Sequence, residues 1–491
     1  MRALHADFRR PNRHHLGFLT VALSGCCLAA TCFGAETRVF RSAEGKSLTA
    51  SVESISGDTV TLKREDGKTF QVAKGKLSTE DQAYLLDFSQ RSANDSKKLN
   101  GAAGHEMANG TPFAERKAEE LAAKLKLKPE SQSKYGRSWR LYAAFAKDYR
   151  LFGAMPYSVA LYSNQDGFAT SLSIVFANKG DFGSTAGMGQ EHFGGGTTAT
   201  ASTLAEAMNR DEETVAKALT GILGEAKVER YGEGKTRRKI SRWDWNGHAF
   251  LLSNEENEYV GLIVVPTEVA DAGGKSSLTK DADVKKRLVA SVVKSANGDV
   301  YVSEIPMVDQ GPKGYCVPAT FERAMRTMGL EADMYLLAMV GQSVAGGGTV
   351  VELLLENVRH QVLSKGRRIK DEELKSLRIR DVKRYIDEGI PVMWRMCSMP
   401  DYNESADKNT AARTTVTDWT AHAAKLALST ANYAKKEKPG SNYHMCMIIG
   451  YNEATQEIAV SDSWGARFER RWVPLAVANW VNNGGIFMIL P

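Results

Sequence analysis

The alternation of apolar and polar positions predicts a small all-β unit over residues 36–89. Apolar side chains recur at every second position in short runs, which is the spacing of half-buried strands. Turn residues separate the runs at Gly45 and at Asp66-Gly67, and Asp-Gly between alternating runs is typical of a type I′ hairpin. Ser78 then predicts the start of a short helix that ends near Phe88.

Residues 90–130 predict a linker followed by a charged helix. The linker, 90–111, is rich in Ser, Asn, Gly, Ala and Lys. From 131 to 275, strand-like apolar runs, a helical stretch at Ala201–Val228 and a hairpin at Ala249–Val265 predict an α+β domain. We assign no family to this domain from its sequence.

The C-terminal region, residues 284–491, predicts helices followed by a twisted antiparallel sheet. Helical periodicity dominates its first part, whereas the final third contains apolar runs of strand length. These runs are Tyr443–Tyr451, Glu457–Asp462, Phe468–Val473 and Gly485–Leu490. The fold is therefore expected to be α+β, in several domains.

A cysteine stands at the start of a predicted helix in this region. The turn-rich segment Gly311–Gly314 leads into Cys316, and Pro318 suits the first helical turn, where a missing N–H costs nothing. A thiol at a helix N-terminus sees the positive end of the macrodipole, which favours the reactive thiolate. Gln310, just upstream, is placed to hold an oxyanion beside that thiolate. This segment predicts a cysteine nucleophile.

Three histidines follow the cysteine, and one of them suits a catalytic role. His360 lies among charged residues of a predicted helix, and His422 lies in an alanine-rich helix. His444 instead begins an apolar strand, where a side chain can project into a cleft. Asp462 ends the next predicted strand, and a carboxylate there could fix the imidazole tautomer. The neighbouring Trp464 would shield that hydrogen bond from water.

Together these segments resemble a papain-like cysteine peptidase, with the bacteriocin-leader-processing branch (peptidase family C thirty-nine) as the nearest match. The segments are Gln310-Gly-Pro-Lys-Gly-Tyr-Cys316-Val-Pro318-Ala, Gly389-Ile-Pro-Val, His444-Met-Cys-Met-Ile-Ile-Gly-Tyr-Asn452 and Ser461-Asp-Ser-Trp-Gly465. Papain-like enzymes place the later site residues roughly 130–150 positions after the cysteine. By this resemblance, Cys316 is the nucleophile, His444 the general base and acid, and Asp462 its orienter. Gln310 is the oxyanion-hole donor.

The resemblance implies acyl transfer through a thioester, on a peptide or protein substrate. It requires no metal and no organic cofactor. Leader peptidases of this branch are commonly fused to a membrane transporter, and this chain has no such apolar span, so the substrate stays open. The segment Asp401–Pro439 is longer than the fold needs, and we interpret it as a loop over the cleft.

Two other functions stay open at this point. One is a catalytically silent peptidase-like scaffold or binding protein, and the other is an acyl transferase or amidase on the same fold. The glycine-rich run Gly183–Gly196 lacks the Lys-Ser/Thr of a phosphate loop, and His192 and His248 lack metal-ligand spacing. The sequence therefore predicts neither a metal site nor a cofactor site.

The N-terminal β unit resembles an SLA-homology domain, a small Src-homology-three-like barrel. The resemblance rests on Arg38-Val-Phe-Arg-Ser-Ala-Glu-Gly45, Gly57-Asp-Thr-Val-Thr-Leu-Lys-Arg-Glu-Asp-Gly-Lys68 and Lys76-Leu-Ser-Thr-Glu-Asp-Gln82. It implies an interaction module that binds an unknown partner. It names no ligand.

Residues 1–35 read as a targeting segment. Arginines precede an apolar, small-residue run from Leu16 to Ala30, and cleavage near Gly34 or Ala35 would release the mature chain. Leu23-Ser-Gly-Cys26 also resembles a lipoprotein box, which would attach the protein to a membrane through a lipidated Cys26. The sequence thus predicts a secreted, periplasmic or cell-envelope protein, and the two processing routes stay open.

The net charge and the number of cysteines argue against a nucleic-acid-binding protein and against a disulfide-rich fold. The formal net charge is +6, of which residues 1–35 carry +3, and no basic stripe with interleaved aromatics appears, so nucleic acid is not an expected partner. Beyond the targeting segment only Cys316, Cys397 and Cys446 remain. Three thiols are no disulfide framework. Cys397 and Cys446 could pair with each other, but both lie in apolar runs, as expected of small core residues.

Overall fold

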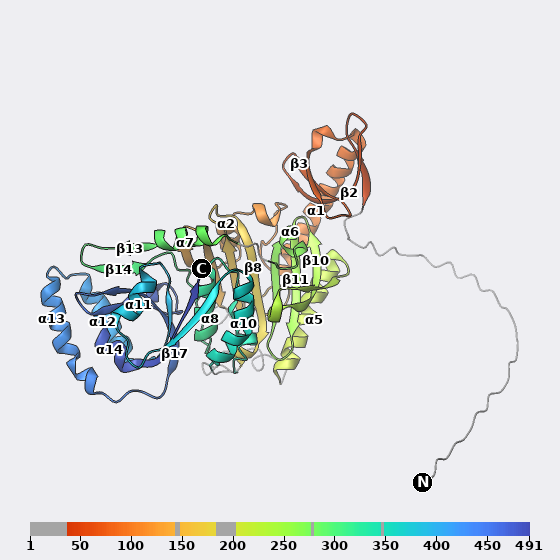
Figure 1. Cartoon of the computed structure of the whole chain (residues 1–491). Helices are drawn as coiled ribbons and strands as arrows, with labels where there is room; N and C mark the ends of the chain where they lie inside the picture. Colours follow the sequence, from red (N-terminus) through yellow and green to blue (C-terminus); the bar gives the residue numbers. More distant parts are fainter. Residues whose placement is uncertain (1–36, 143–147, 183–202, 276–278, 345–347) are drawn as a thin grey trace, which may run out of the picture. The chain divides into compact units, whose positions relative to one another are not determined.

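The computed structural model describes residues 37–142, 148–182, 203–275, 279–344 and 348–491 (Figure 1). The targeting segment with Cys26, the glycine-rich run Gly183–Gly196 and His192 lie outside the described residues. Within those ranges, no helix has both the length and the apolar character that crossing a membrane requires.

The N-terminal unit is a four-stranded antiparallel sheet in the order β1-β2-β3-β4. The strands are β1 (Arg38–Arg41), β2 (Ser47–Ser56), β3 (Thr59–Lys63) and β4 (Thr69–Ala73). Their alternating inward side chains form a small core with Leu77 and Leu85: Phe40, Ala50, Val52, Val60 and Leu62. The all-β prediction is met here, whereas the Src-homology-three-like assignment stays a prediction.

Helix α1 (Thr79–Ala103) corrects the prediction of a short helix followed by a linker. Ser78 caps it as expected, accepting a hydrogen bond from the backbone N–H of Asp81 at 3.2 Å. The helix then continues past Phe88 because Leu99 and Ala103 are buried in the core of the next domain. Tertiary packing here outweighs the low helix propensity of the Ser- and Asn-rich sequence.

An eight-stranded antiparallel sheet, the central sheet, follows in the order β5-β6-β7-β8-β12-β11-β10-β9. Its strands are β5 (Lys128–Ser133), β6 (Gly136–Tyr142), β7 (Ser158–Ser163), β8 (Ala169–Asn178), β9 (Lys227–Tyr231), β10 (Arg238–Trp245), β11 (His248–Glu255) and β12 (Tyr259–Pro266). Its helices are α2 (Ala118–Lys124), α3 (Lys179–Phe182), α5 (Leu204–Leu223) and α6 (Thr267–Asp271). Helix α5 packs along one face, over β8, β10 and β11 (Figure 1).

The C-terminal sheet has the order β13-β14-β17-β16-β20-β15, with β18 pairing both β17 and β19. Its strands are β13 (Val292–Lys294), β14 (Asp299–Val302), β15 (Arg368–Glu373), β16 (Val392–Cys397), β17 (Tyr443–Asn452), β18 (Glu457–Ser461), β19 (Arg471–Pro474) and β20 (Asn482–Leu490). Its helices are α7 (Asp281–Ala290), α8 (Cys316–Thr327), α9 (Met334–Val340), α10 (Val351–Ser364), α11 (Ile379–Ile386), α12 (Pro400–Arg413), α13 (Trp419–Thr430) and α14 (Leu475–Val481). Helices and antiparallel strands together make the α+β fold that the sequence predicts.

The segment predicted to be a loop over the cleft is helical. Residues 400–430 form α12 and α13, and α12 packs against β19. Tyr402 and Ala406 of α12 are fully buried in the C-terminal core, so α12 belongs to the body of the domain.

Helix α8 is buried between the C-terminal core and the second face of the central sheet. Phe321 and Met325 enter the C-terminal core, as their spacing predicts. Ala319, on another face of α8, joins a cluster with Tyr142 and Val175 of the central sheet. The helix that begins with the predicted nucleophile therefore forms part of two cores.

Candidate active site

Cys316 is the first residue of α8, where the sequence places it. The preceding Tyr315 provides no side-chain cap, so the first-turn N–H groups are left to face other acceptors. The backbone N–H groups of Val317 and of Met445, in β17, lie near the thiol and favour its charged form. The hydroxyl of Thr320 donates to the Met445 carbonyl at 3.1 Å, which fixes the start of β17 against α8.

His444 lies at the beginning of β17 and is 7% exposed. Its Nε2 lies 3.0 Å from Oδ1 of Asp462, and the imidazole interacts electrostatically with the neighbouring Cys316 thiol. Because Asp462 engages Nε2, Nδ1 is the ring nitrogen left for the thiol. The indole of Trp464 stacks on the imidazole with ring centroids 4.7 Å apart. The stacked indole limits access of water to the bond between His444 and Asp462.

Asp462 follows β18 and is completely buried. Its Oδ2 accepts a hydrogen bond from Arg471 at 2.8 Å, so each carboxylate oxygen has a partner. Arg471 is itself held by Asn403 and Asp407 of α12, through contacts of 3.0 and 3.1 Å. The insertion 400–430 thus contributes to the support of the buried carboxylate.

The electrostatics favour a charged pair of thiolate and imidazolium. Burial alone would raise the pKa of the Cys316 thiol, but the hydrogen bond and positive charge of His444 outweigh burial and lower it. Burial would lower the pKa of His444, yet its bonds to Asp462 and Cys316 raise it to about 9. The pKa of Asp462 is lowered because His444 and Arg471 outweigh its desolvation. The proton therefore favours the imidazole over the thiol.

Gln310 is buried in the loop before α8, but it makes no hydrogen bond with the thiol. Its side-chain Nε2 donates to the Lys313 carbonyl at 2.8 Å, and its backbone N–H donates to the Ser463 carbonyl at 2.8 Å. Because an amide nitrogen carries two hydrogens, one remains for another acceptor. Its Oε1 is buried and has no partner among the described residues.

The remaining histidines and Cys397 lie apart from this group, whereas the Cys446 thiol is close enough to Asp462 and Cys316 for their charges to affect its pKa. His422 approaches Glu457 at 3.6 Å, and His360 is exposed on α10. Burial lowers the pKa of His248, in β11, to about 4. Cys397 and Cys446 are free and buried, and burial raises the pKa of both thiols. Across the described ranges, no group of three or more His, Cys, Asp or Glu side chains could hold a metal ion.

Sequence reasoning missed the residues that support the buried carboxylate. Arg471 is 3% exposed, whereas its neighbour Arg470 is exposed at the surface. The two arginines are adjacent in the sequence, and no local pattern distinguishes the one that pairs with Asp462. Thr320, which holds β17 against α8, was also missed. Its only sequence signal is its position one helical turn after Cys316, on the same face of α8.

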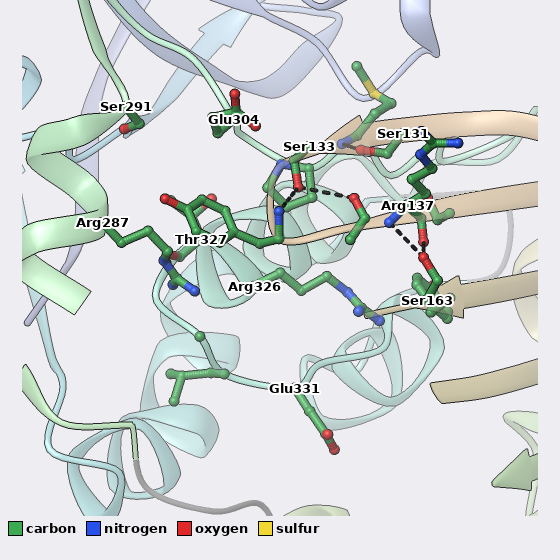
Figure 2. Close-up of a pocket in the computed structure, with 18 of the residues that line it drawn as sticks. Ser131, Ser133, Arg137, Ser163, Arg287, Ser291, Glu304, Arg326, Thr327 and Glu331 are labelled. Atoms are coloured by element: carbon green, nitrogen blue, oxygen red, sulfur yellow. Dashed lines mark hydrogen bonds between the residues drawn. The ribbon is translucent and has the colours of Figure 1, made fainter. Parts of the chain in front are cut away.

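A cavity of about 220 Å³ lies at the other end of α8, where Arg326 and Thr327 line it (Figure 2). Two of its hydroxyls already have partners: Ser133 accepts from the Tyr135 N–H at 3.2 Å, and Ser163 accepts from the Arg137 N–H at 3.0 Å. None of the four predicted site residues lines it. We assign no chemistry to this cavity.

Part of the chain matches the model of a known protein family. Residues 302–485 match the family model of the Peptidase_C39 like family, a stretch that contains Gln310, Cys316, His444 and Asp462. No curated protein matches the chain. The N-terminal sheet and the central sheet lie outside the matched residues. The C-terminal domain is thus similar to cysteine peptidases, which act on peptide or protein substrates.

Proposed function

We propose that this protein is a cysteine peptidase with a Cys316–His444–Asp462 triad. The observation that carries the proposal is a chain of interactions from the thiol through the imidazole to a buried carboxylate, in which Nε2 of His444 lies 3.0 Å from Oδ1 of Asp462. In that chain the pKa of the thiol is lowered and the pKa of the imidazole is raised to about 9. A buried thiol without such a partner would have a raised pKa, as Cys446 has.

Acylation begins with attack of the Cys316 thiolate on the carbonyl carbon of a peptide bond. The electron pair of the carbonyl moves to its oxygen, which becomes an oxyanion. The second amide hydrogen of Gln310 and the backbone N–H of Cys316 are the proposed donors to that oxyanion. Both come from the loop and helix start that bring Cys316 to the site.

The His444 imidazolium then gives its proton to the leaving amine nitrogen. The C–N bond breaks, and the acyl group remains on Cys316 as a thioester. Neutral His444 next takes a proton from water, whose oxygen attacks the thioester, and the acid product leaves with the thiolate restored. Asp462 holds the imidazole orientation in both steps and stabilises its charged form.

A mechanism-based label tests the proposed nucleophile. A thiol-directed epoxide is expected to modify the wild-type protein once, at Cys316, because the other two described thiols are buried with raised pKa values. Peptide mapping by mass spectrometry locates the adduct. Cys397→Ser is the matched control and should label as the wild type does. Labelling that persists in Cys316→Ala would contradict the assignment.

Product analysis separates hydrolysis from transfer. With fluorescein-labelled casein and added glycinamide, a peptidase releases free carboxyl ends even when the amine is present. An acyl transferase would instead release products joined to the amine, because the same thioester reacts with either acceptor.

We also propose export of the protein and binding of an unknown partner by the N-terminal sheet, both on the strength of sequence alone. The mass of the mature N-terminus, after expression in a bacterial host, distinguishes the two processing routes. Cleavage by signal peptidase leaves Ala35 or Glu36 first, whereas lipoprotein processing leaves an acylated Cys26. An unprocessed Met1 would contradict both.

A further inference from the structure

The loop that carries Gln310 is attached to the central sheet. We call residues 309–315 the nucleophile loop. The backbone N–H of Asp309 donates to Glu130 of β5 at 2.9 Å, and the hydroxyl of Tyr142, the last residue of β6, donates to the Asp309 carbonyl. The Tyr142 ring lies so close to Gly311 that a Cβ added there would be 2.9 Å from it. Two strands of the central sheet thus hold one end of the loop.

A buried ion pair holds the middle of the loop. The side chain of Lys313 is completely buried, and its Nζ lies 3.2 Å from the carboxylate of Asp181 in α3. The rings of Tyr142, Tyr335 and Tyr315 surround the ammonium at 4.6, 5.2 and 5.8 Å. A buried ammonium is costly unless it is paired, so Asp181 determines where this side chain can lie.

A close backbone contact holds the end of the loop. The backbone of Gly180, in α3, packs closely against the Tyr315 side chain. A Cβ added to Gly180 would lie 2.5 Å from the Tyr315 ring, so only glycine fits there. Tyr315 immediately precedes Cys316, and α3 therefore contacts the loop at two of its residues.

These contacts reach the proposed oxyanion donor through one carbonyl group. The Lys313 carbonyl accepts from the Gln310 side-chain amide at 2.8 Å and from the Tyr315 backbone N–H at 2.9 Å. A displacement of Lys313 would therefore move its carbonyl and turn the Gln310 amide. The Cys316–His444 pair does not depend on that carbonyl, because α8 and β17 hold it.

We propose that Asp181 and Tyr142 of the central sheet domain are positioning residues for the oxyanion hole. They fix Lys313 and Asp309, and through them the direction of the free amide hydrogen of Gln310. The inference rests on the proposed peptidase function. It makes the central sheet domain, which lies outside the matched family region, a working part of the site.

The change Asp181→Asn tests this role. The variant leaves the Lys313 ammonium without a counter-charge, so the loop is expected to shift. We expect kcat for casein hydrolysis to fall about 10- to 100-fold, with KM within about two-fold of wild type. The rate of Cys316 alkylation by iodoacetamide should stay within about two-fold, because that reaction uses the thiolate and needs no oxyanion donor. Asp401→Asn, which removes the carboxylate of an exposed pair with Lys436, is the matched control.

Tyr142→Phe is the milder second variant, which keeps the ring against Lys313 and removes only the hydroxyl bond to Asp309. A several-fold fall in kcat with unchanged alkylation is expected. Affinity for leupeptin, a peptide aldehyde, should fall in parallel, because thiolate addition to the aldehyde carbon creates the same oxyanion.

The outcomes separate this role from a structural one and from the peptidase proposal itself. If Asp181→Asn lowers turnover, leupeptin affinity and the alkylation rate by the same factor, Asp181 only maintains the fold. If all three quantities in Asp181→Asn equal those of the control Asp401→Asn, the inference is also overturned. A wild-type protein that hydrolyses no peptide would count against the proposed function. Leupeptin binding needs no turnover, so comparing leupeptin affinity between the wild type and the variants would still decide the positioning role.

Discussion

Replacing Cys316 by Ala is expected to lower kcat for peptide hydrolysis about 10⁴-fold or more, without loss of the fold. The thiolate forms the covalent bond to the acyl group, and an alanine at this position has no atom that can replace it. The side chain is small and starts α8 rather than filling its centre, so the helix should remain. Steady-state kinetics with fluorescein-labelled casein, together with a thermal unfolding curve, measures both effects.

Cys397→Ala is the control for this substitution. Cys397 is also a buried free thiol of the C-terminal domain, at the end of β16. Its rate should lie within about two-fold of wild type, because Cys397 pairs with Tyr443 rather than with His444, so the alternation of strand side chains places it on the opposite face of the sheet from His444. Comparable loss of activity in both variants would mean that general damage to the core, and not loss of the nucleophile, explains the result.

Replacing His444 by Ala is expected to lower kcat at neutral pH by about 10²- to 10⁴-fold or more. Two losses combine, because the general acid disappears and the thiol loses the group that lowers its pKa. Burial is then opposed only by nearby backbone N–H groups, so the pKa of the thiol rises and the thiolate population at neutral pH falls. Asp462 keeps its 2.8 Å contact with Arg471, and the variant is therefore expected to fold.

His360→Ala is the matched control, because His360 is exposed on α10. It should retain wild-type kinetics. His444→Ala with normal turnover, or with an unchanged thiol pKa, would remove the basis for the proposed pair.

Cys316 and His444 could be predicted because each lies at the start of an element whose boundary is visible in the local sequence. Glycines and Pro318 indicate the helix that starts at Cys316, and an apolar run indicates the strand that starts at His444. A strand start favoured His444 over His422, and the structure places His422 beside Glu457 instead. Family resemblance supplied the spacing that joined these positions.

The supporting contacts could not be predicted, because their partners come from distant parts of the chain without a local signal. Lys313 and Asp181 are 132 positions apart, and a lysine in a glycine-rich turn is ordinarily a solvated surface residue. Arg471 stands beside Arg470, and only the three-dimensional course of β19 buries one of them. Contacts of this kind depend on how the sheets pack, which periodicity does not report.

Errors in the predicted elements have the same cause. The second half of α1 is helical because Leu99 and Ala103 pack into the central core, and its local composition favours a linker. The last part of the chain shows smaller errors of boundary. Residues 466–468 form a 3₁₀ turn, so β19 begins at Arg471, three residues after the predicted start at Phe468.

The rate of Cys316 alkylation by iodoacetamide as a function of pH tests the central claim most directly. The thiolate–imidazolium pair predicts that the rate rises with an apparent pKa clearly below the ordinary thiol value of 9.0. A second step near pH 9 is expected as His444 loses its proton, and the two steps belong to the coupled pair. In His444→Ala the low step should vanish. A single titration of the wild-type Cys316 at or above pH 9, unaffected by His444→Ala, would show an inert buried thiol and would contradict the proposed site.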